Sequence, residues 1–397
     1  MKITKLIGGG LIIAGTSIGA GMLSLPIVSA GLGFSISFTL ILMLWALMTY
    51  TSLLMLEVHQ YVEHDATLHT LAKKFLGEKG KYIAGVAMLF LFYSLSAAYI
   101  AGGGSQFVDR VAHILSIEID HTMGAIIFAI VVALIVAVGT HLVDKVNRVL
   151  FGLMLVAMAF VIVSLAPNIS GEFLASSPMG SGLVFAALPV IFTSFGFHGS
   201  IPAIVNYFEG ETEKLRIAMY IGSCAPLVIY VFWLLCTLGV VSQIELTENS
   251  SLSNLIASLS ATLNSERLSL VVGLFADLAL VTSFLGVSLG LFEFLLDTTK
   301  KRFKGNRFYV ALLTYLPPLA FALFYPEGFI IALGYAAIAL VILAVFLPVG
   351  MVFKSRENHN NRLGKYQVKG GKVGLMLSLF MGCLIIVSQL LVSMGAF

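Results

Sequence analysis

Residues 11–26 read LIIAGTSIGAGMLSLP, an apolar stretch that three glycines interrupt in its middle. A second apolar stretch, residues 188–202, reads LPVIFTSFGFHGSIP and contains two glycines at the corresponding place. Close packing between membrane helices also uses small residues, but it does not explain the proline that follows the glycines in both stretches. A pair of broken apolar helices at matching places in two halves of a chain predicts a transporter with its substrate site at the breaks.

The composition places the chain in lipid. Of its 397 residues, 59% are hydrophobic and 11% are charged. A soluble domain of this length could not bury so much apolar surface, so we expect a polytopic membrane protein. The net charge of +3 gives no indication of a nucleic-acid partner. The apolar N-terminal run has no small-residue cleavage site, so we expect a retained span and not a signal peptide.

Motifs of catalysis and of metal binding are missing from the sequence. Cys224, Cys236 and Cys383 lie inside apolar runs, without the spacing of disulfides or metal ligands. The chain contains no HExxH, no nucleophile elbow and no phosphate-binding loop. We therefore expect neither an enzyme nor a bound cofactor or metal.

A window of membrane-spanning length predicts an all-α fold with 11 spans. The spans are expected near residues 6–30, 34–57, 82–108, 122–139, 149–166, 183–207, 217–240, 268–297, 308–324, 328–353 and 374–394.

The basic residues predict the orientation of these spans. With the N-terminus in the cytoplasm, 21 of the 23 lysines and arginines fall in cytoplasmic segments, and only Arg110 and Arg267 do not. Such an asymmetry follows the positive-inside rule. We expect an inner-membrane protein whose C-terminus lies outside the cytoplasm.

The two broken spans are the first and the sixth, so the predicted repeat is five spans long and its two copies have opposite orientations. We expect one transmembrane domain over residues 1–397, with repeat one at about 6–166, repeat two at about 183–353 and an extra helix at about 374–394. Residues 68–77, LHTLAKKFLG, have helical spacing and are expected along the cytoplasmic interface. Residues 246–270 form either an external helix or a solvated loop.

A broken helix exposes backbone groups, which a membrane tolerates only where they are buried in protein or line a wet cavity. The half-helix that ends near Ser17 offers carbonyl groups to a cation, and the half-helix that begins after Gly19 offers N–H groups to an anion. An amino acid zwitterion has one charge of each sign. We expect its carboxylate on the backbone of residues 18–21, and its ammonium on carbonyls around Ser17 and in residues 195–198.

Aromatic side chains lie near both predicted backbone sites. Phe195 and Phe197 belong to the second break, and Tyr93 and Tyr99 to the third span. Aromatic walls favour an aromatic ligand through stacked or edge-to-face contacts. These four side chains are therefore predicted to face the side chain of the substrate.

Ionisable residues within the spans are functional candidates by default. Asp277 is expected roughly 13 Å into the eighth span, where it either carries a coupling proton or forms a permanent structural pair. His198 lies at the second break, and it either carries a proton, binds the substrate or holds the break in place. Glu293 is expected at the cytoplasmic headgroups, and Glu57 at the cytoplasmic face, with a gating or interface role.

Four strings carry a resemblance to a known family. They are GTSIGAGMLSLP in the first span, FTSFGFHGS in the sixth, LFADLALVTSFLGVSLGLFEF in the eighth and LPPLAFALFYPEGFIIALGYA in the ninth and tenth. In these strings, and essentially end to end, the chain resembles the bacterial aromatic amino acid permeases. They form the hydroxy and aromatic amino acid permease family within the amino acid–polyamine–organocation superfamily. The pattern is more similar to the tyrosine permeases than to the tryptophan permeases.

The resemblance implies the five-plus-five inverted-repeat fold of the bacterial leucine transporter. It also implies import of an aromatic amino acid, L-tyrosine, by proton symport with alternating access across the bacterial inner membrane. The partners expected are this small molecule and the lipid bilayer. The substrate contacts that it implies are Thr16, Ser17, Ile18, Gly19, Ala20, Gly21, Tyr93, Tyr99, Phe195, Gly196, Phe197, His198 and Gly199.

The resemblance leaves the coupling ion open. In sodium-driven relatives of the fold, a cation lies between the first span and paired hydroxyl groups of the eighth, where this chain has Thr282 and Ser283. Some proton-coupled relatives place a lysine of the fifth span near that point, but VLFGLMLVAMAFVIVSLA contains none. We favour a proton, carried by Asp277 or His198, over sodium.

Two other functions are weighed against symport. An uncoupled facilitator or channel would show rings of polar residues along several spans, whereas the polar groups here gather at the two breaks. A sensor that only binds an amino acid would need an output domain, and none is predicted. A site that selects tyrosine would hydrogen-bond its phenol. The candidate partners of the phenol are Ser94, Ser194, Thr282, Ser288 and Asn206.

Overall fold

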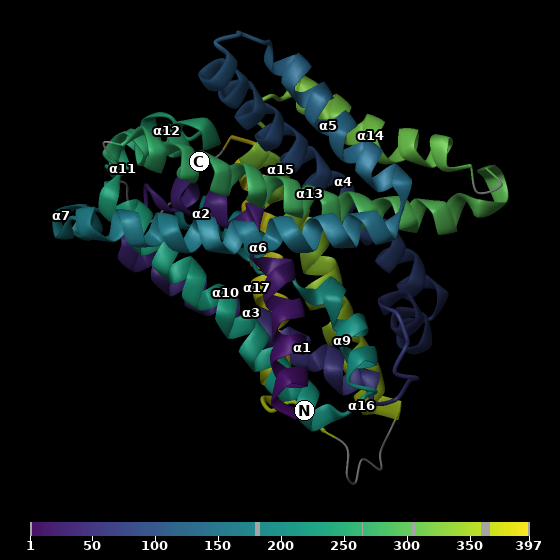
Figure 1. Ribbon diagram of the computed structural model, residues 1–397. Coiled ribbons are helices and arrows are strands. Elements are labelled where there is room, and N and C mark those ends of the chain that lie inside the picture. Colours follow the sequence, from purple (N-terminus) through teal and green to yellow (C-terminus); the bar gives the residue numbers. More distant parts are fainter. Residues whose placement is uncertain (1, 179–182, 264, 304–305, 359–365, 396–397) are drawn as a thin grey trace.

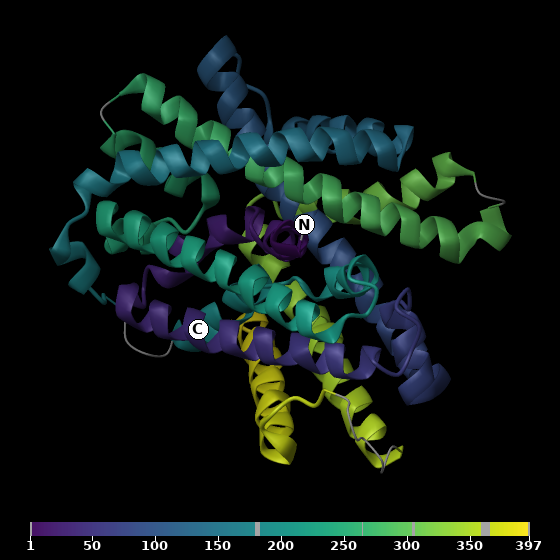
Figure 2. The same cartoon turned by 60° about the horizontal axis from the view of Figure 1, so that its bottom comes forward.

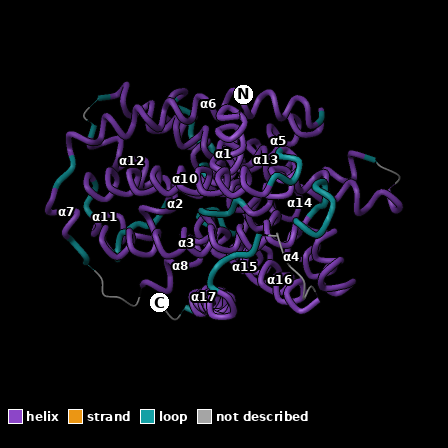
Figure 3. Tube along the Cα trace, turned by 90° about the horizontal axis from the view of Figure 1, so that it is seen from below, coloured by secondary structure: helices purple, strands orange, loops and turns teal. Residues whose placement is uncertain are grey.

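The computed structural model describes residues 2–178, 183–263, 265–303, 306–358 and 366–395. Within these ranges the chain consists of helices and connecting loops, with no strand (Figure 3). Ten helices are long and apolar enough to cross a membrane, and a bent pair adds an eleventh span. The prediction of an all-α, multi-pass membrane protein with 11 spans is confirmed.

The spans follow one another in the predicted order. The first five are α1 (Lys2–Ser17) with α2 (Ala20–Ser29), α3 (Gly33–His59), α4 (Leu68–Leu115), α5 (His121–Val138) and α6 (Thr140–Leu165). The next five are α8 (Leu183–Ser194) with α9 (Ile201–Tyr207), α10 (Thr212–Val240), α13 (Glu266–Phe303), α14 (Arg307–Phe324) and α15 (Phe329–Val341), which continues through residues 342–346 into α16 (Leu347–Asn358). The last is α17 (Gly371–Ser393).

Shorter helices lie in the loops. They are the single turn Ala166–Asn168, α7 (Gly171–Ala175), α11 (Gln243–Glu248) and α12 (Leu252–Thr262). Residues 246–270 therefore do include helices. The side chain of Ser251 caps α12 by accepting from the amide of Asn254 at 3.1 Å. α12 contacts α2, α4 and α13.

The spans gather into two groups (Figures 1 and 2). α4, α5, α13 and α14 lie together, whereas α1 packs along α10 and α10 along α3. Trp233 of α10 and Phe275 of α13 are both fully buried where the groups meet. Their rings make an edge-on contact with centroids 5.2 Å apart, a geometry that adds to the burial of two large apolar surfaces.

Several helices extend further than the apolar runs predicted. α6 begins at Thr140 and not at residue 149, and α13 continues to Phe303 and not to residue 297. In both cases the added turns carry charged residues, which end an apolar window but do not end a helix. α4 also incorporates residues 68–77, with a kink at Gly77, whose φ of 71° is in the left-handed region. The predicted helix at residues 68–77 is confirmed up to this kink.

Candidate functional site

The first break lies between α1 and α2, whose axes differ in direction by 55°. The backbone N–H of Ala20 donates to the hydroxyl oxygen of Ser283 on α13 at 2.9 Å. A side chain at Gly19 would overlap that same oxygen. The break is therefore held by α13, and the close approach of the two helices requires a glycine at position 19.

The second break lies between α8 and α9. After Ser194 the chain turns back, and the amide of Gly196 donates to the carbonyl of Thr193 at 3.1 Å. A single 3₁₀ turn, His198–Ser200, then leads into α9. The same pattern, Thr-Ser-X-Gly, occurs at both breaks, at residues 16–19 and 193–196. The two interruptions thus have the same local chemistry.

Hydrogen bonds tie the two breaks together. The hydroxyl of Ser194 donates to the carbonyl of Gly21 at 3.0 Å. The hydroxyl of Tyr230 on α10 lies 2.6 Å from the carbonyl oxygen of Ser17 and 2.7 Å from that of Ser194. These two carbonyls belong to the last residues of α1 and α8. Tyr230 therefore joins the C-terminal ends of both half-helices.

A cavity of about 420 Å³ lies between the two breaks and the helices α4 and α13. This volume is within the range of small-molecule sites, about 300–1,000 Å³. The cavity extends from the breaks to Leu68, at the start of α4. Its polar lining comes from both breaks and from Asn147, Thr282 and Ser283, and its aromatic lining includes Phe92, Phe151 and Tyr99. The arrangement combines backbone groups of opposite polarity with aromatic walls.

Most of the predicted contact residues line this cavity. The predicted residues in the lining are Thr16, Ser17, Ile18, Gly19, Ala20, Gly21, Tyr99, Gly196, His198, Gly199, Thr282 and Ser283. Of the five candidate partners of a phenol, Ser194 and Thr282 belong to the lining, and Ser94, Ser288 and Asn206 do not. Thr282 donates to the carbonyl of Leu278 in its own helix at 2.7 Å.

Three predicted aromatic contacts lie elsewhere. Phe195 and Phe197 are fully buried and do not belong to the cavity lining. Phe195 packs edge-on against Tyr230, and Phe197 stacks on His198. Tyr93 donates to the carbonyl of Leu313 on α14 at 2.8 Å. Tyr93 and Tyr99 are six residues apart, which turns them about 240° from each other around α4, so only Tyr99 faces the cavity.

Of the two predicted proton carriers, His198 lines the cavity and Asp277 does not. His198 is 3% exposed, and its Nε2 lies 2.9 Å from the hydroxyl oxygen of Thr51 on α3. Thr51 donates its own proton to the carbonyl of Met48 at 3.2 Å. With the Thr51 proton assigned to Met48, Nε2 is the donor to Thr51 and Nδ1 keeps a lone pair. Nδ1 has no hydrogen-bond partner within the described part of the chain.

Asp277 forms an ion pair and does not line the cavity. Its Oδ2 lies 3.0 Å from Nε of Arg110, near the C-terminal end of α4. The neighbouring Asp109 accepts a hydrogen bond from Ser253 of α12 at 2.6 Å. The pair joins α13 to α4 next to α12. The geometry agrees with a structural pair, and the role of Asp277 in carrying a proton stays a prediction.

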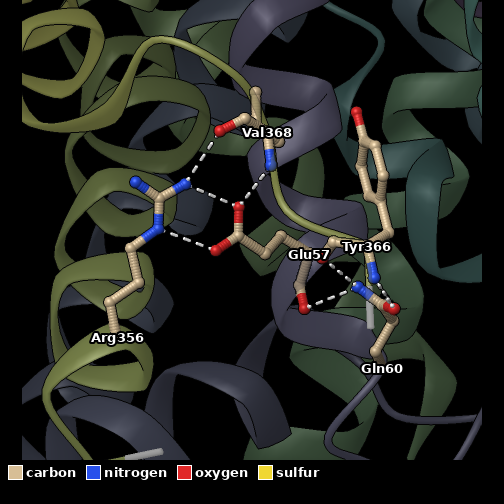
Figure 4. A network of polar contacts seen from close by, with 5 residues as sticks. All are labelled: Glu57, Gln60, Arg356, Tyr366 and Val368. Atoms are coloured by element: carbon tan, nitrogen blue, oxygen red, sulfur yellow. Dashed lines mark hydrogen bonds and ion pairs between the residues drawn. The ribbon is translucent and has the colours of Figure 1, made fainter. Parts of the chain in front are cut away.

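Glu57 is likewise paired, at the end of α3. It is 2% exposed, and both of its oxygens accept from the guanidinium of Arg356 on α16 at 2.8 Å (Figure 4). The amide of Val368 donates to Glu57 at 2.9 Å. Gln60 exchanges two hydrogen bonds of 2.9 Å with the backbone of Tyr366. The segment before α17 is thereby fastened to the ends of α3 and α16.

Several cavity residues were not predicted. Phe92 and Met88 on α4, Asn147 and Phe151 on α6, and Gly286 on α13 all belong to the lining. Asn147 and Phe151 are four residues apart, and so are Phe92 and Met88, so each pair shares one helix face. Gly286 likewise has Gly290, four residues further on, in the lining. This spacing was a usable signal, but similar spacings occur on the lipid-facing sides of the helices.

A helical membrane protein with two broken spans around a ligand-sized cavity has the architecture of a membrane transport protein. A family model described as the tryptophan/tyrosine permease family matches residues 2–389. The chain belongs to this family and is a transport protein, not an enzyme.

Curated relatives match nearly the full length. Tyrosine-specific transport system 1 of Haemophilus influenzae is 43% identical over 96% of both chains. Tyrosine-specific transport system 2 of the same organism is 40% identical and covers 100% of this chain and 98% of its own. A tryptophan-specific transport protein of Pseudomonas aeruginosa is 32% identical, and the match covers 98% of this chain and 95% of that protein.

Proposed function

We propose that this protein imports L-tyrosine across the bacterial inner membrane by proton symport with alternating access. The observation that carries the proposal is the single cavity in which both helix breaks and three aromatic rings meet. The two relatives named as tyrosine-specific transport systems, at 43% and 40% identity, support the choice of substrate. The shared Thr-Ser-X-Gly at both breaks supports two inverted repeats of five spans, with α17 as an addition.

The cavity offers a place to each part of a tyrosine zwitterion. The N-terminal turn of α2 lies at the cavity wall with Gly19 and Gly21, and a helix N-terminus favours an anion. Two of its N–H groups already have acceptors, because Ala20 donates to Ser283 and Met22 to the carbonyl of Gly19. This turn would hold the carboxylate. The carbonyls of Ser17 and Ser194 already accept from Tyr230, so the ammonium would use the other carbonyls of the second break. The ring would pack against Phe92, Phe151 and Tyr99.

His198 is the better placed of the two predicted proton carriers. Its Nδ1 lone pair is unused within the described chain, and the residue lines the cavity. Protonation there would place a positive charge next to the bound substrate, and this links the proton to the amino acid. Asp277 is separated from the cavity and paired with Arg110. A sodium ion at Thr282 and Ser283 is the alternative coupling arrangement.

The orientation proposed follows the distribution of basic residues, with the N-terminus in the cytoplasm and the C-terminus outside. The cavity reaches Leu68, next to a loop that this orientation places in the cytoplasm. At the opposite end α12 packs on α2, α4 and α13. The conformation thus resembles an inward-facing state of an alternating-access cycle.

Uptake into proteoliposomes tests the proposal. Labelled L-tyrosine would be offered with a proton gradient or a sodium gradient imposed separately, with unlabelled phenylalanine and tryptophan as competitors. Accumulation driven by the proton gradient alone is the expected result. Accumulation that needs sodium would move the coupling site to Thr282 and Ser283. Equilibration without accumulation under either gradient would identify a facilitator, and symport would be rejected.

A further inference from the structure

We infer that the hydroxyl group of Tyr230 takes the place of a coupling cation at the junction of the two helix breaks. The consequence is that substrate binding at this junction needs no sodium. The inference rests on the proposed transport function and deepens it, because it concerns the ion that accompanies the substrate.

The first step is the convergence of two carbonyl groups on one point. The carbonyls of Ser17 and Ser194 end two half-helices from opposite halves of the chain, and their oxygens lie 2.6 and 2.7 Å from the same Tyr230 oxygen. The C-terminal end of a helix carries partial negative charge. In transporters with broken helices, such ends bind the coupling sodium ion or proton. The junction therefore has the electrostatics of a cation site.

The second step is the chemistry of the group that fills it. A tyrosine hydroxyl has one proton to donate, and both oxygen–oxygen distances are those of hydrogen bonds. One O–H dipole is thus shared by two acceptors, with its positive end toward the carbonyls. This supplies, without a mobile ion, the positive potential that would otherwise be required to hold two half-helix ends together.

The third step is that the hydroxyl is fixed in place. Tyr230 is fully buried, and its ring packs edge-on against Phe195 with centroids 5.1 Å apart at 62°. Tyr230 does not belong to the cavity lining, whereas Ser17 and Ser194 do. Substrate can therefore approach the breaks, but a cation cannot enter the junction while the phenol is there.

Two substitutions distinguish a cation substitute from an ordinary structural hydrogen bond. Tyr230→Phe removes the hydroxyl and leaves both carbonyls without their donor. Tyr230→Asn also clears space and adds an amide oxygen, so that three oxygen ligands surround the vacated point. Oxygen ligands are those that hard cations prefer. Tyr50→Phe is the matched control, because the Tyr50 hydroxyl is buried without a hydrogen-bond partner in the described chain.

The measurement is tyrosine uptake by each variant in sodium chloride and in choline chloride, at the same proton gradient. Wild type and Tyr50→Phe should transport equally in both salts. The initial uptake rate of Tyr230→Phe should be at least tenfold lower than that of wild type. The initial uptake rate of Tyr230→Asn should be at least threefold higher in sodium chloride than in choline chloride. A Tyr230→Phe variant with wild-type uptake, or a Tyr230→Asn variant without any response to sodium, would overturn the inference.

A second measurement needs no transport. The melting temperature of each purified variant would be compared in sodium and choline chloride without substrate. Sodium should raise the melting temperature of Tyr230→Asn and not that of wild type. If neither responds, Tyr230 is a structural tie only and the inference fails. If sodium stabilises Tyr230→Asn but neither wild type nor any variant takes up tyrosine, the inference stands and the proposed substrate or transport function fails instead.

Discussion

The backbone N–H of Ala20 lies 2.9 Å from the hydroxyl oxygen of Ser283, and this hydrogen bond joins the first helix break to α13. Ser283 and Tyr99 both line the cavity. One serine thus connects the α2 half-helix to α13 at the wall of the cavity. The position of the proposed carboxylate site depends on it.

Replacement of Ser283 by alanine should weaken substrate binding. A buried donor that loses its acceptor costs about 1–3 kcal/mol, and the donor here belongs to the turn proposed to hold the carboxylate. We expect the KM for tyrosine uptake to rise roughly fivefold or more, since that is the factor for about 1 kcal/mol. Ser288→Ala is the control, because Ser288 donates to the carbonyl of Phe284 in the same helix and lies outside the cavity lining. Unchanged kinetics in Ser283→Ala would remove this bond from the binding site.

A leucine at Gly286 should block the cavity without disturbing the fold. A Cβ at Gly286 meets no atom within 4 Å, and the residue lines the cavity. A helical Gly→Leu change is otherwise favourable by about 0.5–1 kcal/mol. We expect uptake to fall at least tenfold while the melting temperature stays the same or rises. Gly152→Leu is the matched control, because Gly152 on α6 has equal space but does not line the cavity. If both variants transport like wild type, the cavity is not the substrate path.

The fold could be predicted because lipid imposes length and polarity on every span. Each of the 11 apolar runs corresponds to a helix or to a bent pair. The ends were less accurate where charged residues continue a helix, as at the start of α6 and the end of α13. A hydropathy window registers the end of the apolar layer, whereas backbone hydrogen bonding decides the end of the helix.

The candidate site was predictable where backbone chemistry leaves a mark in the sequence. Glycine and proline revealed both breaks, and residues 16–21 all line the cavity. Side-chain direction leaves no such mark. Tyr93 and Phe195 could be assigned to the site by proximity in sequence, but the rotation of α4 turns Tyr93 away, and Phe195 packs against Tyr230 of α10. Tyr230 contacts a carbonyl 213 residues earlier in the chain, a pairing that only the tertiary packing establishes.

The two candidate proton carriers can be separated by isosteric changes. His198→Gln keeps a donor for Thr51 but cannot carry a proton at Nδ1. If His198 couples transport, this variant should lose accumulation of tyrosine in a pH gradient and keep exchange of tyrosine across the membrane. Asp277→Asn leaves the guanidinium of Arg110 without its partner, so we expect reduced folded yield with accumulation preserved. The opposite pattern, with accumulation lost only in Asp277→Asn, would assign the proton to Asp277.

The ion pair between Glu57 and Arg356 should dominate the stability of the end of the molecule at which α3 and α16 meet. Breaking a buried pair from one side costs about 3–5 kcal/mol, because the remaining charge is left uncompensated. Glu57→Gln should therefore lower the melting temperature of the purified protein clearly. Glu357→Gln provides the control, since its pair with Lys354 is more than half exposed and exposed pairs contribute about 0–1 kcal/mol.

A double variant shows whether the charge or the connection matters. Replacement of a buried ion pair by two apolar residues is often neutral or stabilising, so Glu57→Met with Arg356→Met should melt closer to wild type than Glu57→Gln does. The amide of Val368 would still lose its acceptor in the double variant. If the double variant melts as low as the single one, the tie to residues 366–368 sets the stability, and the α3–α16 charge pair contributes little.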